Sequence, residues 1–463
     1  MEPNHPQLRP ISHCFITHEY LPPQSNQPFY LGPSDLLVLS VHYNQKGLLF
    51  HKPPEAFNHG DHFMVTLLHR LKSSLSATLF HFYPLTGRLA TTTNGIIYVD
   101  CINSPGAKFI HAALDNITAS DILSPLHVPS LVQSLFDLNK VVNYDGQTLP
   151  LLSIQVTELL DAVFIACSFN HCLGDGTSFW NFFNMWSEIF QAPSSEDGHA
   201  IISISQPPIL ERWFPDGYDP IINLPFTDPS QFISRFEAPE LRRRFFHFSA
   251  KSIADLKAKA NEECDTKDIS SFQTLTALVW RAITRARRIP LDQSTCCMMS
   301  ANYRRRLKPA LRENYLGNMI TSVKADAKVG ELVERAGLGW GAWKLHEAVK
   351  NLTYEKIRES LEEWIKCPYT YQLGSILNPN IIKMGGWSRF NVYGSEFGMG
   401  KAVGVRSGYG NTFDGKVIVY PGCEGGGSID LEICLLPQNM ANLESDLEFM
   451  NAISSSPPHL SCT

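Results

Sequence analysis

A stretch of irregular composition divides this chain near its middle. From about residue 191 to residue 240, segments such as SSEDG, PDGYDP and FTDPS are rich in proline, aspartate, serine and glycine and show no sustained hydrophobic period. A single hydrophobic core seldom serves more than ~250–300 residues, and this chain has 463. We therefore predict two domains, at residues 1–195 and 241–463, that are joined by a long crossover loop at residues 196–240.

Each half mixes helices with strands, which indicates the α/β fold class. In the first half, apolar residues recur every four positions from Phe63 to Leu79, a pattern typical of a helix with one buried face. In the second half, Ser270 and Gln273 have the spacing of a helix-capping box, and they begin a predicted helix over 270–287. We expect mixed sheets and helices in both domains.

The sequence HCLGDG, which begins at His171, follows the most apolar part of the predicted core. Residues 151–171 are typical of two strands, the second apolar on both faces, and residues 177–190 are typical of a helix capped by Thr177 or Ser178. His171 is therefore expected at the end of a buried strand, on a turn between two elements. Junctions of this kind are where catalytic groups are usually displayed.

The spacing of His171 and Asp175 leaves two interpretations open. A zinc-binding helix would carry a second histidine four positions on, and a serine hydrolase would carry a G-x-S-x-G turn; the sequence has neither. With its ordinary pKa near ~6.5, a histidine can accept a proton from a hydroxyl or an amine at neutral pH. His171 is thus either a catalytic base or a hydrogen-bonded structural residue.

Charge and hydropathy argue against several classes of protein. The net charge of −6 and the isoelectric point near 6.2 do not suit a nucleic-acid binder. No apolar stretch approaches the ~20 residues needed to span a bilayer, and the first residues lack the pattern of a secretory signal. The eleven cysteines include no CxxC pair, which suits neither a zinc site nor a regular disulfide framework. We expect a reduced, cytoplasmic protein that binds no membrane, metal or nucleic acid.

Several motifs, in a fixed order along the chain, resemble those of the plant BAHD acyltransferases, which transfer acyl groups from coenzyme A thioesters. They are YPLTGRL near the start, HCLGDG in mid-chain, NYRRRLKP and NYLGNMI further on, and SEFGMGKAVGVRSG near the end. The resemblance covers nearly the whole chain. It implies two domains of chloramphenicol-acetyltransferase-like topology, with a channel between them and His171 near its middle.

The resemblance also implies roles for the residues of two motifs. The HxxxDG motif of the family is carried by His171, Asp175 and Gly176. Its histidine is implied to be the general base, and its aspartate to order the turn through an arginine. The second motif, usually DFGWG, is EFGMG here and is implied to be structural, with Arg304 as the expected partner of its carboxylate. The residues of this motif are Glu396, Phe397, Gly398, Met399, which replaces a tryptophan, and Gly400.

The expected substrate contacts follow from the same resemblance. Coenzyme A carries three phosphates, so a cationic or helix N-terminal site is expected for it. The candidates for coenzyme A binding are Lys257, Ser270, Ser271 and Arg406. The family places acceptor-facing residues within LVLSVHYNQ, where the candidates are Ser40 and His42. Each candidate also has a structural alternative. The serines at 270 and 271 can cap a helix, the two cations can be surface charges, and His42 can be a histidine of the surface or the core.

The implied function is transfer of an acyl group from acyl-CoA, as co-substrate, to a hydroxyl of a small-molecule plant metabolite by a monomeric enzyme. No covalent acyl-enzyme and no permanently bound cofactor or metal is expected; Cys172 is the alternative nucleophile, although strand geometry turns it away from His171. An amine acceptor is the nearest alternative. The EFGMG variant is also similar to a subfamily implicated in cuticle polymers and to a member that became a lyase in salicylate formation. A lyase that uses no coenzyme A and a non-catalytic binding protein therefore stay open.

Overall fold

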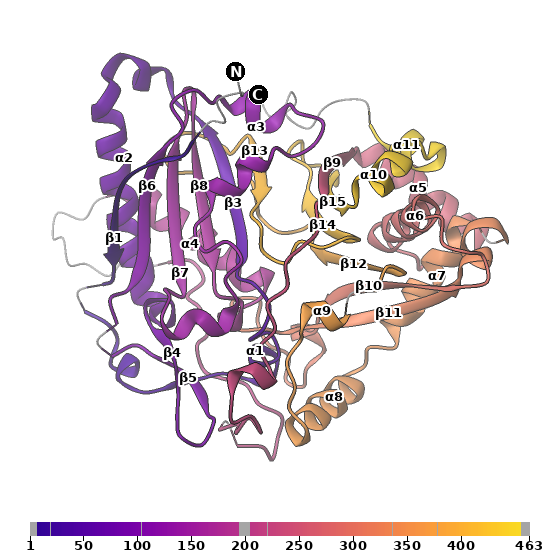
Figure 1. Ribbon diagram of the computed structural model, residues 1–463, viewed down its shortest axis with the longest axis horizontal. Coiled ribbons are helices and arrows are strands. Elements are labelled where there is room, and N and C mark those ends of the chain that lie inside the picture. Colours follow the sequence, from indigo (N-terminus) through magenta and orange to yellow (C-terminus); the bar gives the residue numbers. More distant parts are fainter. Residues whose placement is uncertain are drawn as a thin grey trace.

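Two six-stranded sheets, one built mainly from each half of the chain, form the framework of the protein (Figure 1). The computed structural model describes residues 7–18, 20–102, 104–193, 204–219, 221–335, 337–376 and 378–454. The first sheet has the strand order β1 (Arg9–Ile16), β6 (Ala107–Ala113), β7 (Leu152–Glu158), β8 (Ala162–Phe169), β3 (Asn44–His51) and β13 (Gly404–Ser407). All its neighbours are antiparallel except β6 and β7.

The second sheet contains both parallel and antiparallel pairs. Its order is β11 (Ile320–Lys328), β10 (Ser294–Asn302), β12 (Ile381–Gly386), β14 (Lys416–Pro421), β15 (Ile429–Leu435) and β9 (Arg242–Phe248). The pairs β10–β12 and β12–β14 are parallel and the others antiparallel. A third, small sheet joins β2 (Phe29–Tyr30), β5 (Ile97–Asp100) and β4 (Arg88–Thr91). The two large mixed sheets agree with the predicted fold class.

The first sheet is buried on both faces, as the apolar sequence of β8 predicts. One face packs on α2 (Pro54–His81) and α4 (Gly176–Gln191), which are joined by a hydrogen bond from Trp186 Nε1 to Ser74 Oγ of 3.0 Å. The other face packs on α3 (Ala119–Leu123) and the loop after it. Phe164 and Ile165, adjacent on β8, accordingly belong to different apolar clusters. β8 is therefore a rigid support for the turn that follows it.

Helices cover one face of the second sheet, and its other face is turned toward the first half of the chain (Figure 1). The covering helices are α5 (Ala250–Glu263), α6 (Ser271–Ala286), α7 (Leu338–Lys350), α10 (Pro437–Leu443) and α11 (Leu447–Ala452). Ser270 and Gln273 form the predicted capping box of α6. The shorter α1 (Pro33–Leu36) and α9 (Leu373–Ile376), together with α8 (Tyr354–Lys366), complete the helices named in Figure 1.

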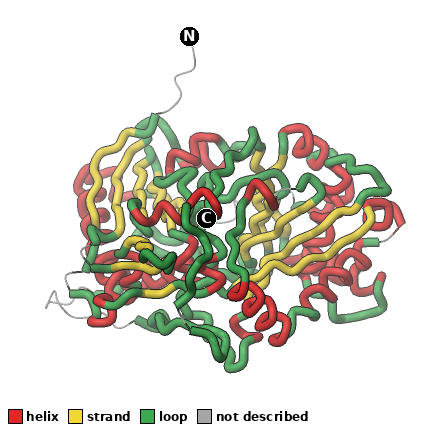
Figure 2. Tube along the Cα trace, turned by 60° about the horizontal axis from the view of Figure 1, so that its bottom comes forward, coloured by secondary structure: helices red, strands yellow, loops and turns green. Residues whose placement is uncertain are grey.

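The two halves of the chain are interlocked. β13 comes from the second half but pairs with β3 as the last strand of the first sheet, from Gly404 opposite Leu49 to Ser407 opposite Lys46. Figure 2 shows loops running between the two groups of strands. Parts of the predicted crossover (196–203 and 220) and of the predicted domain ends (1–6 and 455–463) lie outside the described residues. The described part of the crossover contains one short helical turn, Pro229–Gln231.

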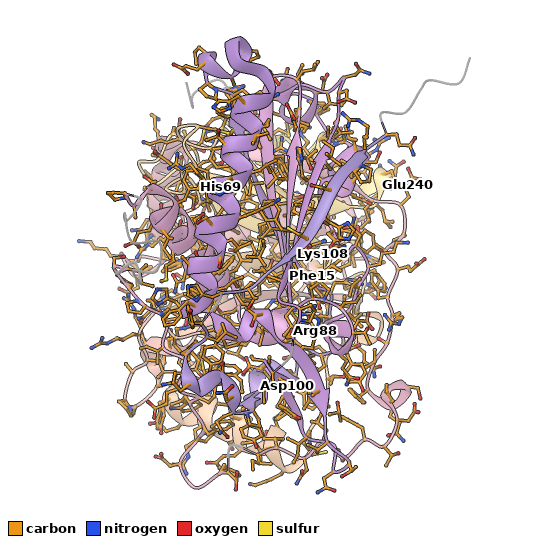
Figure 3. All side chains as sticks on the ribbon, turned by 90° about the vertical axis from the view of Figure 1, so that its left-hand side faces the viewer. Phe15, His69, Arg88, Asp100, Lys108 and Glu240 are labelled. Atoms are coloured by element: carbon orange, nitrogen blue, oxygen red, sulfur yellow. The ribbon has the colours of Figure 1, made fainter. Side chains whose placement is uncertain are left out.

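The outer edge of the first sheet is exposed. Phe15 on β1 lies opposite Lys108 on β6, and 45% of its surface is accessible (Figure 3). Among the described residues, no helix combines the length and the apolar character needed to cross a bilayer. Nine of the cysteines in the described part of the chain are free thiols. Cys423 is disulfide-bonded, which differs from the fully reduced state expected from the sequence.

Candidate active site

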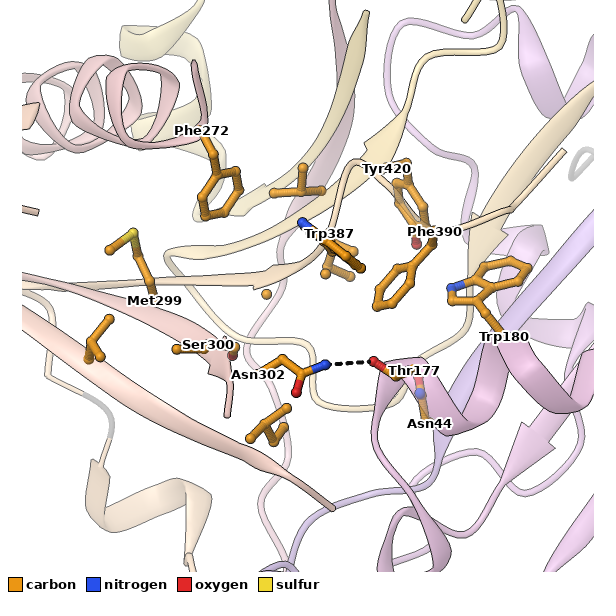
Figure 4. A pocket seen from close by; sticks show the side chains of 18 of the residues that line it. Asn44, Thr177, Trp180, Phe272, Met299, Ser300, Asn302, Trp387, Phe390 and Tyr420 are labelled. Carbon is orange, nitrogen blue, oxygen red and sulfur yellow. Dashed lines mark hydrogen bonds between the residues drawn. The ribbon is translucent and has the colours of Figure 1, made fainter. Parts of the chain in front are cut away.

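A cavity of about 550 Å³ lies between the two halves of the chain, and His171 lines it. Its walls come from β3 and the start of α4 on one side and from β10, β12 and β14 on the other. Apolar walls with a few polar groups are typical of a small-molecule site. The aromatic part of the lining, shown in Figure 4, consists of Trp180, Phe272, Trp387, Phe390 and Tyr420.

Two buried asparagines hold the backbone at His171. β8 ends at Phe169, and the side chain of Asn170 then accepts a hydrogen bond from the backbone N–H of Cys172 (3.0 Å), which begins a single helical turn over His171–Leu173. The backbone N–H of His171 donates to Oδ1 of Asn143 (2.8 Å), and Nδ2 of Asn170 donates to the carbonyl of Asn143 (2.8 Å). The position of His171 is therefore fixed from the backbone outward.

Asn318 fixes the tautomer of His171. Its Nδ2 donates both to Oδ1 of Asp35 (2.9 Å) and to the backbone carbonyl of His171 (2.7 Å), neither of which can donate in return. Oδ1 of Asn318 is therefore the atom that lies 3.1 Å from Nδ1 of His171, and Nδ1 must carry the proton in the neutral ring. Nε2 is left as the available basic nitrogen.

The surroundings of His171 keep its imidazole neutral. Burial lowers the pKa of His171 below its usual value, and the positive charge of Lys416 acts in the same direction, against the raising effects of Asp175 and Asn318. Asp35, which orients Asn318, is in turn paired with the guanidinium of Arg212. A neutral imidazole with Nε2 unprotonated can accept a proton at neutral pH.

Asp175 does not face the substrate cavity but anchors the turn. Its Oδ1 accepts hydrogen bonds from the N–H groups of Thr177 and Ser178 (3.0 and 3.1 Å), so Asp175 caps α4, and the prediction of Thr177 or Ser178 as the cap was wrong. Its Oδ2 lies 2.6 Å from Nη1 of Arg304, and both side chains are fully buried. Although burial acts to raise it, the pKa of Asp175 is held below its usual value by Arg304.

The EFGMG segment is a packing element, and one prediction about it was wrong. Arg304 pairs with Asp175, not with Glu396, whose carboxylate has no ion pair among the described side chains. Phe397 packs in the core of the first half, with ring centroids 4.8–5.9 Å from those of its neighbours Phe50, Phe183, Trp186 and Phe190. Met399 is buried in the same cluster and does not line the cavity.

Glycines in both motifs serve the local geometry. Gly398 and Gly400 have φ angles of +74° and +75°, in the region that favours glycine. Gly176 lines the cavity at the start of α4, where an added Cβ would lie 3.1 Å from the ring of Phe390. The HCLGDG motif thus contributes directly to the cavity lining. The EFGMG motif contributes to the apolar core of the first half.

The candidates for coenzyme A binding divide into those near the cavity and those away from it. Ser270 lines the cavity, and Ser271 follows it as the first residue of α6. Lys257 lies on the exposed side of α5, outside the cavity lining. Arg406 is buried and donates from Nη2 to the carbonyl of Ile122 (3.0 Å). Arg406 is therefore a structural residue, and neither cation is placed to bind a ligand in this cavity.

The two acceptor candidates lie behind the cavity wall. The hydroxyl of Ser40 donates to the carbonyl of Ser234 (3.1 Å), which fastens the crossover segment. His42 is bonded to Asn411 through its backbone N–H (3.0 Å) and its ring (3.2 Å), and burial lowers its pKa to about 4. Both side chains are buried and neither lines the cavity, and their contact with the acceptor stays a prediction.

One residue that contacts His171 and two that line the cavity were missed by the sequence analysis. Asn318 belongs to NYLGN, a segment used only as a marker of resemblance, and its 147-residue separation from His171 gave no spacing signal. Lys46 and Lys416 also line the cavity. A single lysine in a strand forms no recognisable sequence motif. The one signal for Lys416 was the alternation of side chains along β14, which places it on the face opposite Val417.

Comparison with known proteins places these features in a family. The sequence profile described as "Transferase family" matches residues 21–450. An uncharacterised acetyltransferase of Arabidopsis thaliana is 36% identical over 452 residues, which cover 95% of this chain and 98% of the relative. The BAHD acyltransferase DCR of the same plant is 32% identical over 451 residues, 93% of this chain and 90% of the relative. This chain belongs to the BAHD acyltransferases.

The fold of this BAHD acyltransferase agrees with that of a solved structure. The complex of F. sporotrichioides TRI101 with coenzyme A and T-2 has a TM-score of 0.70 to this chain and 17% sequence identity. The likeness covers 92% of this chain and 99% of the other. The predicted chloramphenicol-acetyltransferase-like fold is thereby confirmed, and so is the prediction that the protein is an enzyme that transfers acyl groups.

Proposed function

We propose that this BAHD acyltransferase transfers an acyl group from a coenzyme A thioester to the hydroxyl of a small-molecule plant metabolite, with His171 as the general base. The observation that carries the proposal is the hydrogen bond of Nδ1 with Asn318, which leaves Nε2 as the basic nitrogen in the cavity. The solved relative that binds coenzyme A and T-2 together supports a donor and an acceptor held at once.

The proposed reaction proceeds by direct attack. His171 accepts the proton of the acceptor hydroxyl as the oxygen attacks the acyl carbonyl, and a tetrahedral oxyanion forms. The imidazolium then returns this proton to the departing sulfur of coenzyme A, so the base is regenerated. Cys172 supports this path over a covalent intermediate, because it is fully buried and burial raises the pKa of its thiol well above the usual value.

The proposed position of coenzyme A is the part of the cavity near the start of α6. Ser270 lines the cavity there. Arg305 and Arg306 also line the cavity, and Arg305, which is 78% exposed and pairs with Glu313 at 2.9 Å, can turn to a phosphate. We further propose that the enzyme acts as a cytoplasmic monomer. It is proposed to need no bound metal and no permanent cofactor.

Release of free thiol tests this function. Purified enzyme is mixed with acetyl-, malonyl-, hydroxycinnamoyl- and long-chain acyl-CoA and with pooled plant alcohols, phenols and amines, and the thiol is followed colorimetrically. We expect release that depends on an alcohol or a phenol. Release that depends only on amines would replace the hydroxyl acceptor by an amine. No release from any donor by a folded enzyme, with consumption of a pooled compound in the absence of coenzyme A, would contradict the proposal in favour of a lyase.

The role of Asn318 gives a second prediction. In Asn318→Leu the Nδ1–H of His171 loses its acceptor, so kcat should fall at least tenfold while KM changes less. The hydrogen bond that His171 donates to Asn318 acts to raise the pKa of His171, so its loss should lower that pKa further. Activity is lost as pH falls through the pKa of the base, so the acidic limb of kcat/KM should lie below pH 6.5 in the wild type and lower still in the variant. An unchanged limb would contradict the positioning role.

A further inference from the structure

Lys416 is an unpaired amine within the cavity that contains His171. It lies at the start of β14, where Lys416, Ile418 and Tyr420 alternate toward the cavity while Val417 and Val419 face the helices. Nζ of Lys416 has no hydrogen bond and no ion pair with any described residue, and its one ring contact is with Phe413 at 5.7 Å. The side chain is half-buried and lines the cavity, so an anionic group of a ligand in the cavity can reach it.

The neighbouring cavity lysine, Lys46, already has its partners. Its Nζ donates to the hydroxyl of Ser407 (2.7 Å) and lies 5.5 Å from the ring centroid of Tyr420. The same Ser407 hydroxyl donates to Oε2 of Glu432 (2.6 Å), whose other oxygen lies 3.4 Å from the guanidinium of Arg243. The buried carboxylate of this region is therefore occupied by other residues, and none remains for Lys416.

The electrostatic environment of Lys416 is consistent with a missing anion. Burial, together with the nearby charges of Lys383 and Lys46, lowers the pKa of Lys416 to about 7, although Glu432 acts to raise it. Lys416 and His171 line the same cavity, and the charge of Lys416 acts to lower the pKa of His171. An anion beside Lys416 would stabilise its charged form without displacing any protein partner.

We propose that Lys416, with Lys46 behind it, forms a carboxylate-binding subsite beside His171, and that one of the two substrates carries a carboxylate. The inference rests on the proposed function only in placing the reacting atom at His171. The carboxylate belongs either to the acceptor or to the acyl chain, and both would be held through a charge-assisted hydrogen bond to Nζ of Lys416.

Binding measured without turnover tests the subsite separately from the reaction. Calorimetric titrations compare 4-hydroxybenzoate and 4-hydroxycinnamate with their methyl esters, and malonyl-CoA with acetyl-CoA. In the wild type we expect the carboxylate member to bind at least tenfold tighter in the acceptor pairs or in the donor pair. The pair that shows this preference identifies which substrate carries the carboxylate. In Lys416→Met the ratio should fall to within twofold of one.

Two further variants keep the test specific. Lys416→Arg keeps the charge and should keep most of the preference. Lys383→Met is the comparison variant, because Lys383 lies opposite Lys416 on the adjacent strand β12 but does not line the cavity. Since the charge of Lys383 lowers the pKa of Lys416, the carboxylate preference of this variant should be at least as strong as that of the wild type. A wild type with no preference in any pair, or a preference that survives in Lys416→Met, would overturn the subsite. Because no turnover is involved, failure of acyl transfer would leave these results unaffected.

Discussion

Replacing His171 with alanine should reduce kcat/KM for acceptor-dependent thiol release by roughly 10²–10⁴-fold, the usual contribution of a general base. The reason is geometric as well as chemical. Nδ1 is committed to Asn318, so Nε2 is the ring nitrogen that can take the acceptor proton. His171→Gln should lose as much, because glutamine keeps polarity and size but cannot accept a proton at neutral pH.

Cys172→Ala is the control for this experiment. Cys172 is adjacent to His171 but fully buried in the core of the first half, so its variant should stay within threefold of the wild type. The far-UV circular dichroism of each variant verifies that it is folded. A His171→Ala enzyme that retained a tenth of wild-type activity would refute the assignment, and a Cys172→Ala enzyme that lost all activity would reopen covalent catalysis.

The second large effect is expected on stability. Asp175→Asn should lower the free energy of unfolding by about 3–5 kcal/mol, because it leaves the fully buried guanidinium of Arg304 without its counter-charge. Asparagine can still cap α4, so the loss reports the ion pair and not the cap. Urea unfolding followed by tryptophan fluorescence measures the change. Activity should fall as well, since the same turn carries His171.

Two comparisons isolate the buried pair. Glu355→Gln removes one partner of the Lys308–Glu355 pair, in which both side chains are more than 60% exposed, and should change stability by less than about 1 kcal/mol. The double variant Asp175→Asn/Arg304→Met removes both charges and should recover part of the loss. An Asp175→Asn protein as stable as the wild type would show that Arg304 finds compensation elsewhere.

The sequence predicted local elements well because their signals are local. The apolar stripe from Phe63 to Leu79 lies within α2, and the capping box at Ser270 begins α6. The exchange of β13 between the halves had no such signal. Its four residues, Gly404–Ser407, pair with Lys46–Leu49, more than 350 positions away. Strand partners of this kind are chosen by tertiary packing, and no periodicity within a short strand specifies them.

The sequence located the turn that carries His171 at the end of β8. It was less successful in predicting the partners of the charged residues Arg304 and Arg406. His171 was found because it follows an apolar strand and belongs to a motif. The partner of Arg304 was mistaken because Asp175 and Glu396 are both acidic, and only the fold determines which one the buried guanidinium meets. Arg406 has the charge expected of a phosphate ligand but is buried against backbone carbonyls. Residue type alone does not reveal burial.

The position of β13 has a consequence for how the chain reaches its native state. The last strand of the first sheet is supplied only after some 400 residues have been made. Until then β3 is paired with β8 on one side only, and the N–H and C=O groups on its other side lack partners. Such an edge can pair with other chains. The first sheet therefore stays incomplete until the second half has been synthesised. A chain cut at the crossover should yield two aggregation-prone fragments and not two independently folding domains.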